Sequence, residues 1–359
     1  MNMMRRVVFV TATAVALSGC GTATLRPFTD PRLDGSGAHD ATPAFESSGR
    51  DPGCEKAELV STGGPFPRDR STLAIRWTGY ANFELAWNGQ VILLDAYFDR
   101  GSFFPPLGFK AADVKRADAI LIGHGHVDHM SDAAAVGART GAPVVGAPVT
   151  TEKLLTQQID PKQIRTVTGR GGEVLRFGGF TVEPILGRHG EPPANVVKAF
   201  QQALRSVTKG PTAEQQAELA AIRARGSSDP RIVTEGTIAY LITLDNGFRI
   251  MFRDSGGRVT DYERAAMERV GRVDVALVAV SASYVQELTV PQALEHARTY
   301  RPDVYMPAHH DSPFDNLWRA TEPLFQALKA DNPRIVTVSR GYREPVCFNT
   351  AYSVSRGGR

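Results

Sequence analysis

Residues 119–130 read AILIGHGHVDHM, a short apolar run followed at once by three histidines and an aspartate. The whole chain of 359 residues has only eight histidines, so three of them within six positions is a marked concentration. At the end of an extended strand, His124 and His126 point to the same side, and a turn after them aims Asp128 and His129 at a neighbouring point. Imidazole and carboxylate groups are natural ligands for Zn, Fe or Mn. The stretch therefore predicts half of a two-metal site rather than a solvated loop.

The remaining ligands must come from elsewhere in the chain. The predicted strand TVEPILGR precedes His189, the strand RIMFRD ends in Asp254, and DVYMPA precedes both His309 and His310. All these candidates lie at strand ends before a break, where α/β folds place their sites. His296 instead falls within a predicted helix, and we expect it at the helix surface.

Two Asn-Gly pairs indicate hairpins of similar design. Asn88–Gly89 divides FELAWNGQVILLD, and Asn246–Gly247 divides YLITLDNGFRIMFRD; the second strand of each ends in an aspartate, Asp95 or Asp254. Asn-Gly suits the positive φ angles of a type I′ turn between two apolar strands. The repeated pattern indicates two related halves.

Strands alternate with short helices along the rest of the chain, which predicts an α/β layered domain. Helices are expected at 261–270, 291–299 and 315–329, and a further helix is expected to begin at a cap on Ser131 and to stop at Gly141.

Six segments resemble one known superfamily, in order. HGHVDH matches the H-x-H-x-D-H signature of the metallo-β-lactamase superfamily, and GRHG, FRDSG and PAHHD match its later ligand motifs. With WTGYANFEL and LLD, the resemblance runs from about Leu73 to Ser339. WTGYANF and DVALVAVSASY are most similar to the branch containing ascorbate-phosphate lactonase-like proteins and the N-acyl-phosphatidylethanolamine phospholipase D. That branch usually has a histidine at the position of Tyr80. The superfamily fold is a four-layer αββα sandwich of two similar halves.

The resemblance implies a ligand set for two divalent ions, with zinc expected and manganese or iron as alternatives. It assigns His124, His126 and His189 to the first ion, Asp128, His129 and His309 to the second, and Asp254 to both. His310 is the alternative to His309. Asp95 would support the ligand loop without binding an ion.

The implied activity is that of a dinuclear metallohydrolase, in which two ions activate water against an ester-type substrate. The substrate would be a phosphodiester, such as a phospholipid, or a lactone. Asp128 would also orient the water, and Tyr80, Asn82, Tyr284 and His310 are candidate substrate contacts. The alternatives are a mononuclear iron oxidoreductase of the same fold and a non-catalytic metal-binding lipoprotein.

The N-terminal sequence predicts that the protein is exported, and we do not expect this segment to be part of the folded domain. Arg5 and Arg6 precede an apolar stretch that fits a signal sequence and is too short to span a bilayer. LSGC then resembles a bacterial lipobox, with Cys20 as the lipidated residue. We therefore expect a signal peptide at 1–19 and a membrane-anchored lipoprotein, in the periplasm or on the outer cell surface. Residues 20–70 are expected to form a tether and irregular lead-in, and 71–359 the folded domain.

Two cysteines remain after Cys20. Cys54 and Cys347 form an even pair in an exported protein, which favours a disulfide.

The formal net charge of +3 is too balanced for a nucleic-acid-binding surface. The expected partners are a small-molecule or lipid substrate and a membrane held through the lipid, and the oligomeric state is left open.

Residues 191–232 lack a strand pattern and are expected to form a helical insert. Val196, Val197, Phe200 and Leu204 recur at helical spacing, and Thr212 with Gln215 makes a capping box at the start of a second helix. The insert is either packing decoration or a lid beside the site, since it directly follows GRHGEPP.

Overall fold

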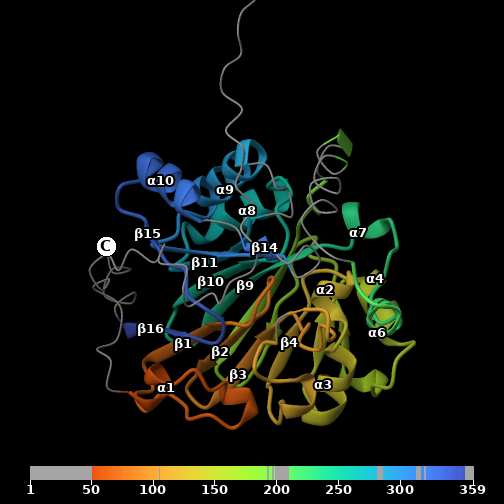
Figure 1. The fold of residues 1–359 in the computed structure, drawn as a ribbon. Coiled ribbons are helices and arrows are strands. Elements are labelled where there is room, and N and C mark those ends of the chain that lie inside the picture. Colours follow the sequence, from red (N-terminus) through yellow and green to blue (C-terminus); the bar gives the residue numbers. More distant parts are fainter. Residues whose placement is uncertain are drawn as a thin grey trace, which may run out of the picture.

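The computed structural model describes residues 51–104, 106–191, 194–195, 198, 210–280, 286–312, 317–318 and 321–351. Within that part of the chain, two seven-stranded sheets stack face to face (Figure 1). The first sheet has the strand order β16-β1-β2-β3-β4-β5-β6, and the second has β15-β12-β11-β10-β9-β8-β7.

The strands of the first sheet are β1 (Thr72–Trp77), β2 (Phe83–Trp87), β3 (Gln90–Leu94), β4 (Ala119–Leu121), β5 (Val144–Gly146), β6 (Ile164–Thr166) and β16 (Pro345–Asn349). Those of the second are β7 (Leu175–Arg176), β8 (Phe180–Leu186), β9 (Ile238–Leu244), β10 (Arg249–Arg253), β11 (Val275–Ala279), β12 (Val304–Ala308) and β15 (Val336–Thr337). A short separate hairpin joins β13 (Asp311–Ser312) to β14 (Leu317–Trp318).

The two sheets share one topology. In the first, β16, β1, β2 and β3 pair antiparallel, and β3 to β6 pair parallel. In the second, β7, β8, β9 and β10 pair antiparallel, and β10, β11, β12 and β15 pair parallel. The two halves expected from the repeated Asn-Gly hairpins are therefore present.

The hairpins themselves differ in their turns. Asn88 (φ 46°) and Gly89 (φ 79°) both have positive φ, as a type I′ turn requires. In the second hairpin only Gly247 has positive φ, at 86°, and the amide of Leu244 bonds to the carbonyl of Phe248 across a longer loop. The prediction of one hairpin design is right for position and wrong for turn geometry, because the extra residue in the second loop changes the turn.

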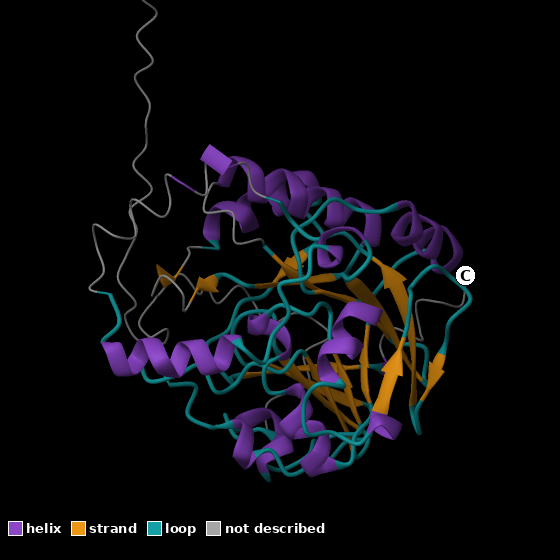
Figure 2. Cartoon of the chain, turned by 90° about the vertical axis from the view of Figure 1, so that its right-hand side faces the viewer, coloured by secondary structure: helices purple, strands orange, loops and turns teal. Residues whose placement is uncertain are grey.

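Helices cover both outer faces of the stacked sheets (Figures 1 and 2). The first sheet is covered by α3 (Ala133–Thr140) and α4 (Pro148–Leu154), and the second by α8 (Asp261–Val270), α9 (Gln286–Tyr300) and α10 (Glu322–Asp331). Shorter elements are α1 (Pro52–Glu55), α2 (Val127–Met130), α7 (Arg231–Thr234) and 3-10 turns at Val60–Thr62, Ala111–Asp113 and Pro161–Gln163, while α6 (Ala213–Arg223) lies in the insert. None of the helices described is both long and apolar enough to cross a membrane.

Strand alternation builds the layers. Leu73 and Ile75 of β1 belong to the cluster between the sheets, whereas Ala74 belongs to the cluster under the helices of the first sheet. In β10, Ile250 faces the inner cluster and Met251 the cluster under α8 and α9. Successive residues of a strand point to opposite faces, so a sheet covered on both sides needs apolar residues at every position. The result is the αββα sandwich that the resemblance implied.

Three helix boundaries and one histidine differ from the sequence prediction. Helix α3 ends before Gly141 as expected, but its N-cap is Asp132, and Ser131 instead ends α2. Residues 317–318 form β14, so the helix expected from 315 begins only at Glu322, with a proline in its first turn. The helix expected at 291–299 starts earlier, at Gln286, and continues through Pro291. His296 is buried and stacks on Tyr300 one turn away, because it lies on the face of α9 that packs on the sheet; the expected surface position is wrong.

Ordered structure begins before the expected boundary near residue 71. Helix α1 is joined to β16 by a disulfide between Cys54 and Cys347, whose Cα atoms are 5.9 Å apart. Arg76 and Glu84 are fully buried beneath this segment: Arg76 donates to the carbonyl of Gly53, and Glu84 accepts the amides at residues 60 and 61. Residues 1–50, including Cys20, lie outside the described chain.

The second helix of the insert has the expected capping box. The Thr212 hydroxyl accepts the Gln215 amide at 3.3 Å, and the Gln215 side chain accepts the Thr212 amide at 2.9 Å. The helix predicted from Val196, Val197, Phe200 and Leu204 lies outside the described residues. The end of the insert contacts the loop of metal-ligand candidates, as described below.

Candidate metal centre

The candidate ligands converge at one edge of the two sheets because they follow strands that run in the same direction. His124 follows β4, Asp254 follows β10 and His309 follows β12. His189 follows β8, which runs parallel to β10 because both pair antiparallel with β9. Carboxyl ends of parallel strands meet at one edge, so ligands separated by long stretches of sequence can meet there.

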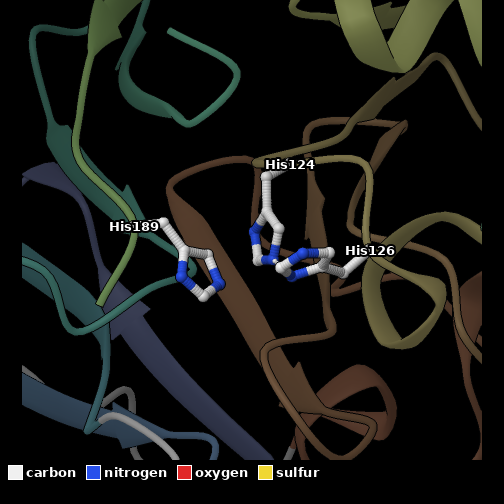
Figure 3. Close-up of side chains that lie close together, drawn as sticks. All are labelled: His124, His126 and His189. Atoms are coloured by element: carbon white, nitrogen blue, oxygen red, sulfur yellow. Dashed lines mark hydrogen bonds between the residues drawn. The ribbon is translucent and has the colours of Figure 1, made fainter. Parts of the chain in front are cut away.

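Three interlocking groups of potential ligands result. Within each, one donor atom per residue lies within 4.8 Å of the others, and the groups are His124–His126–His189, His124–His129–Asp254 and Asp128–His129–His309. The first group contains three imidazoles that converge from two loops (Figure 3). Because His124 and His129 each belong to two groups, the three form one continuous cluster.

Asp254 lies at the centre of this cluster. Its side chain is fully buried, and Oδ2 lies 2.5 Å from His124 Nδ1 and 3.3 Å from His129 Nδ1. Oδ1 is also buried and has no hydrogen-bond partner among the described residues. A buried carboxylate oxygen without a partner is costly. A cation between the histidine groups would supply the missing partner, so the donor set fits a metal ion.

The burial of the histidines favours the protonation state that metal binding needs. Desolvation lowers the pKa of His124 well below its ordinary value, and the neighbouring His129 and His126 lower it further. Desolvation, followed by the charges of His124 and His126, likewise lowers the pKa of His189. A metal ligand must be a neutral imidazole, so these side chains need release no proton when an ion binds.

His129 has the opposite environment. Burial lowers its pKa, but the carboxylates of Asp128, Asp95 and Asp254 outweigh burial and raise the pKa well above the ordinary value. Burial raises the pKa of Asp254, against the opposing charge of His129. The three acidic neighbours therefore favour the protonated form of His129, in contrast to His124 and His189.

Asp95 has the supporting position that the resemblance implied. Its Oδ2 lies 2.7 Å from His129 Nδ1, and its Oδ1 accepts the amide of Gly123 at 2.8 Å. It therefore holds both the ring of His129 and the start of the ligand loop. Such partners fix the orientation and tautomer of a ligating histidine.

Strained backbone is concentrated around the cluster. Tyr80, Asp95 and His309 have φ angles of 53°, 58° and 60°, in the left-handed region that bulky residues seldom adopt. A bond between the His309 amide and the Tyr80 carbonyl, 2.7 Å long, ties two of them together. Such strain persists where surrounding contacts impose it, and it is typical of functional sites.

Gly123 has no room for a side chain. A Cβ atom there would lie 2.1 Å from the carboxylate carbon of Asp254. The glycine that ends the apolar run is therefore what lets β4 approach the central carboxylate.

Two candidate substrate contacts lie deeper than the sequence pattern suggests. Asn82 is fully buried; its Oδ1 accepts the Tyr97 amide and its Nδ2 donates to the Gly79 carbonyl, each at 2.8 Å. Both ends of its amide are engaged by backbone, so Asn82 shapes the loop and is not placed to contact a substrate. The Tyr80 side chain is buried as well, and its ring centroid lies 4.1 Å from that of His309. Tyr80 therefore packs on a candidate ligand rather than facing open solvent.

Of the two adjacent histidines, His309 has the geometry of a candidate ligand. His309 Nε2 lies 3.3 Å from Asp128 Oδ2, whereas His310 belongs to none of the three groups. The His310 ring is buried and stacks on Trp77 at 4.2 Å, so it is not placed to contact a substrate. Tyr284 lies outside the described residues.

The end of the insert is hydrogen-bonded to the ligand loop. The sequence pattern did not predict this contact. The Ser227 amide donates to the Gly125 carbonyl at 2.7 Å. Arg225 donates to the Ser131 carbonyl and to Asp132, each at 3.0 Å, and Asp132 Oδ2 accepts the amide of Phe98 at 2.7 Å. The insert is thus attached directly to the loop that carries His124 to His129.

The sequence pattern also did not single out two buried arginines, Arg100 and Arg253. A signal was available for Arg253, since a charge interrupts the apolar strand RIMFRD immediately before Asp254. For Arg100 we identify no such signal in the sequence.

An αββα sandwich with histidines and aspartates gathered at the carboxyl ends of its strands defines the metallo-β-lactamase class. Residues 74–309 match the family model described as the Beta-lactamase superfamily domain, so the chain belongs to the metallo-β-lactamase superfamily.

Two curated relatives are similar in sequence, and one solved structure is similar in fold. The chain is 22% identical over 270 residues to a UPF0173 metal-dependent hydrolase of Polynucleobacter asymbioticus, covering 74% of this chain and 83% of the relative. It is 25% identical over 258 residues to one of Cupriavidus necator, covering 69% and 78%. The fold is similar to that of Igni18, described as a novel metallo hydrolase from Ignicoccus hospitalis, with a TM-score of 0.54, 17% identity, and coverage of 77% of this chain and 98% of that one.

Proposed function

We propose that this protein is a hydrolase whose two divalent ions activate water against an ester-type substrate. The broader assignment, a metal-dependent hydrolase of the metallo-β-lactamase superfamily, is supported by the family match and by the names of its relatives. The observation that carries the two-ion proposal is the buried Asp254 carboxylate between two histidine groups, with one oxygen lacking any described hydrogen-bond partner.

The proposed ligands follow from the three groups. His124, His126 and His189 would hold the first ion, Asp128, His129 and His309 the second, and Asp254 would bind both. Five imidazoles with two carboxylates suit zinc, and manganese or iron is compatible with the same donors. When bound, the ions would act as Lewis acids and lower the pKa of water towards ~7.

Asp128 is the proposed proton acceptor beside the ions. Burial raises its pKa, but the charge of His129 and hydrogen bonds from His129 and His309 outweigh burial, so the pKa lies well below the ordinary value. Its Oδ2 lies 3.4 Å from His129 Nε2, and the side chain remains 14% exposed, which lets solvent reach the carboxylate. An ionised, accessible carboxylate can orient a water molecule and accept its proton.

We propose a phosphodiester, such as a phospholipid, or a lactone as the substrate, following the sequence resemblance to the lactonase and phospholipase D branch. A cavity of about 840 Å³ between residues 98–113 and α6 supports an amphiphilic substrate. Buried Phe98, Phe104, Leu107 and Ile222 line it. Ile222 packs with Tyr80 and Tyr97, and Tyr80 lies against His309, so the cavity is close to the second ligand group.

Metal analysis combined with activity tests this proposal. Protein purified without added metal should contain about two zinc or manganese ions per chain and should hydrolyse a bis-aryl phosphate or an aryl lactone. Dialysis against a chelator should remove both ions and the activity, and zinc or manganese should restore the activity. One iron per chain with persulfide oxidation would support the oxidoreductase alternative instead, and two bound ions without turnover of any probe would support a non-catalytic metal-binding protein.

We further propose that the enzyme is exported and anchored to a membrane through lipid on Cys20, because LSGC follows a basic pair and an apolar stretch. A Cys20→Ala variant, expressed with its signal sequence, should move from the membrane fraction to the soluble fraction and should lose incorporation of labelled palmitate. Membrane attachment that survives the substitution would mean that another anchor is used.

A further inference from the structure

We infer that each half of the metal centre is positioned by its own buried arginine: Arg253 for the first group of ligands and Arg100 for the second. This inference rests on the proposed two-ion site, and it assigns roles to two side chains that contact no proposed ion. Both guanidinium groups are buried, and each bonds to the backbone of loops that carry ligands or their immediate neighbours.

Arg253 joins the loops of His189 and Asp254. Its Nη1 and Nη2 donate to the Arg188 carbonyl at 3.1 and 3.0 Å, directly before His189. Nη2 also donates to the carbonyls of Gly257 and Arg258, at 3.1 and 3.2 Å, in the loop that follows Asp254. The planar guanidinium presents several donors in fixed directions, so one side chain sets the separation of the two loops.

The two loops touch where Arg253 binds them. A Cβ atom at Gly257 would lie 1.9 Å from the Arg188 carbonyl oxygen, so only glycine allows this approach. The Gly190 amide donates to Ser255 Oγ at 2.9 Å on the other side of His189. His189 is therefore bracketed by contacts to the Asp254 loop.

Arg253 is itself held by a buried acid. Its Nε lies 2.8 Å from Glu263 Oε1, which also accepts the Tyr300 hydroxyl. Glu263 Oε2 accepts the Thr260 amide at 2.7 Å, as the capping box of α8. The position of the guanidinium is thus fixed by the outer helix layer.

Arg100 has the corresponding position beside the second group. Its Nη2 donates to the Thr78 carbonyl at 3.1 Å, and its Nη1 lies 3.3 Å from Asp311 Oδ2. Asp311 Oδ1 accepts the Tyr80 amide at 2.7 Å, and the Tyr80 carbonyl accepts the His309 amide at 2.7 Å. This chain of bonds holds Tyr80 and His309 in their positive-φ conformations.

Substitution by lysine separates this role from a general one in folding. Lysine keeps the positive charge opposite Glu263 or Asp311 but loses the fork of donors. Loss of an outer partner weakens metal binding by about 10–100-fold. Arg253→Lys should weaken the site of His124, His126 and His189 by that factor and, through the shared Asp254, the other site by less. Arg100→Lys should weaken mainly the site of Asp128, His129 and His309.

The test is a titration of metal-free, full-length protein with ¹¹³Cd²⁺, followed by NMR and by chelator competition. A site with three imidazoles and the shared carboxylate, and a site with two imidazoles and two carboxylates, give separate cadmium resonances, so each affinity is read independently of activity. Arg76→Lys is the matched control, because Arg76 is fully buried and paired with Glu84 but binds the N-terminal segment. It should lower thermal stability and leave both cadmium affinities unchanged.

Both variants with wild-type affinities, or with equal losses at both sites, would overturn the inference. If a lysine variant does not fold, Glu263→Gln and Asp311→Asn loosen the same arginines and should show the same selective losses. Wild-type protein that binds a single cadmium ion would contradict the two-ion proposal itself; Arg253→Lys would then still test whether this arginine positions the histidine site.

Discussion

The variant His126→Ala is expected to lose hydrolysis of the phosphate and lactone probes by about 10³-fold or more. His126 is one of only three imidazoles in the first group, with Nδ1 2.9 Å from His124 Nε2. A bound ion contributes several kcal/mol to catalysis, and about 4 kcal/mol corresponds to 10³ in rate. Steady-state kinetics together with metal content should show the loss of one ion and of turnover, while far-ultraviolet circular dichroism remains that of the wild type.

The neighbouring histidines provide a matched pair of controls for this experiment. His309→Ala should remove the second ion, because His309 belongs to the group with Asp128 and His129. His310→Ala should keep both ions and lower only the stability, since His310 stacks on Trp77. Unchanged turnover of His126→Ala at full metal content would remove the hydrolase proposal, and loss of an ion from His310→Ala would reverse the assignment of the two histidines.

Removal of the disulfide is expected to lower the free energy of unfolding by about 2–5 kcal/mol. The bond joins residues separated by 293 positions, so the cross-link restricts nearly the whole described chain when it is unfolded. It also holds α1 near Arg76 and Glu84, whose buried charges depend on the N-terminal segment for hydrogen-bond partners. A Cys54→Ala/Cys347→Ala double variant should therefore unfold at lower guanidinium concentration than the wild type.

Reduction supplies the control for this prediction. The wild type under reducing conditions should approach the unfolding midpoint of the double variant, and a reductant should not change the midpoint of the double variant. An unchanged midpoint in the double variant would show that the remaining contacts of the N-terminal segment suffice. Metal content should be retained in the folded double variant, since neither cysteine belongs to the three ligand groups.

Local sequence signals predict those parts of the fold that depend on neighbouring residues. Helix α8 has the bounds that the sequence predicts, because Thr260 caps its start and Gly271, with φ 83°, follows its end. Asn88–Gly89 marks the turn between β2 and β3 for a similar reason. The predicted start of α10 is too early, because residues 317–318 pair with β13 in a contact that the helical pattern does not contain.

Burial of polar side chains is the part that the sequence pattern predicts poorly. It places His296 on a helix surface, although Ala293, Ala297 and Tyr300 share its buried face at helical spacing. It predicts Asn82 as a substrate contact, yet the side-chain amide of Asn82 is hydrogen-bonded to backbone and fixes the loop between β1 and β2. A polar residue is exposed or buried according to the partners that packing brings to it, and those partners are distant in sequence.

The order of motifs along the chain was enough to predict the candidate ligands, their positions at strand ends and the two related halves of the fold, because strand ends, turns and glycine breaks are local features. Their convergence depended on packing between distant segments. The contacts of Arg253 with the Arg188 carbonyl span 65 positions, and that of Arg100 with Asp311 spans 211. The first contact forms only when β8 and β10 come together in the second sheet, and the second only when the two sheets stack. For that reason the preference for His309 over His310 and the proposed roles of the buried arginines became visible only in the folded chain.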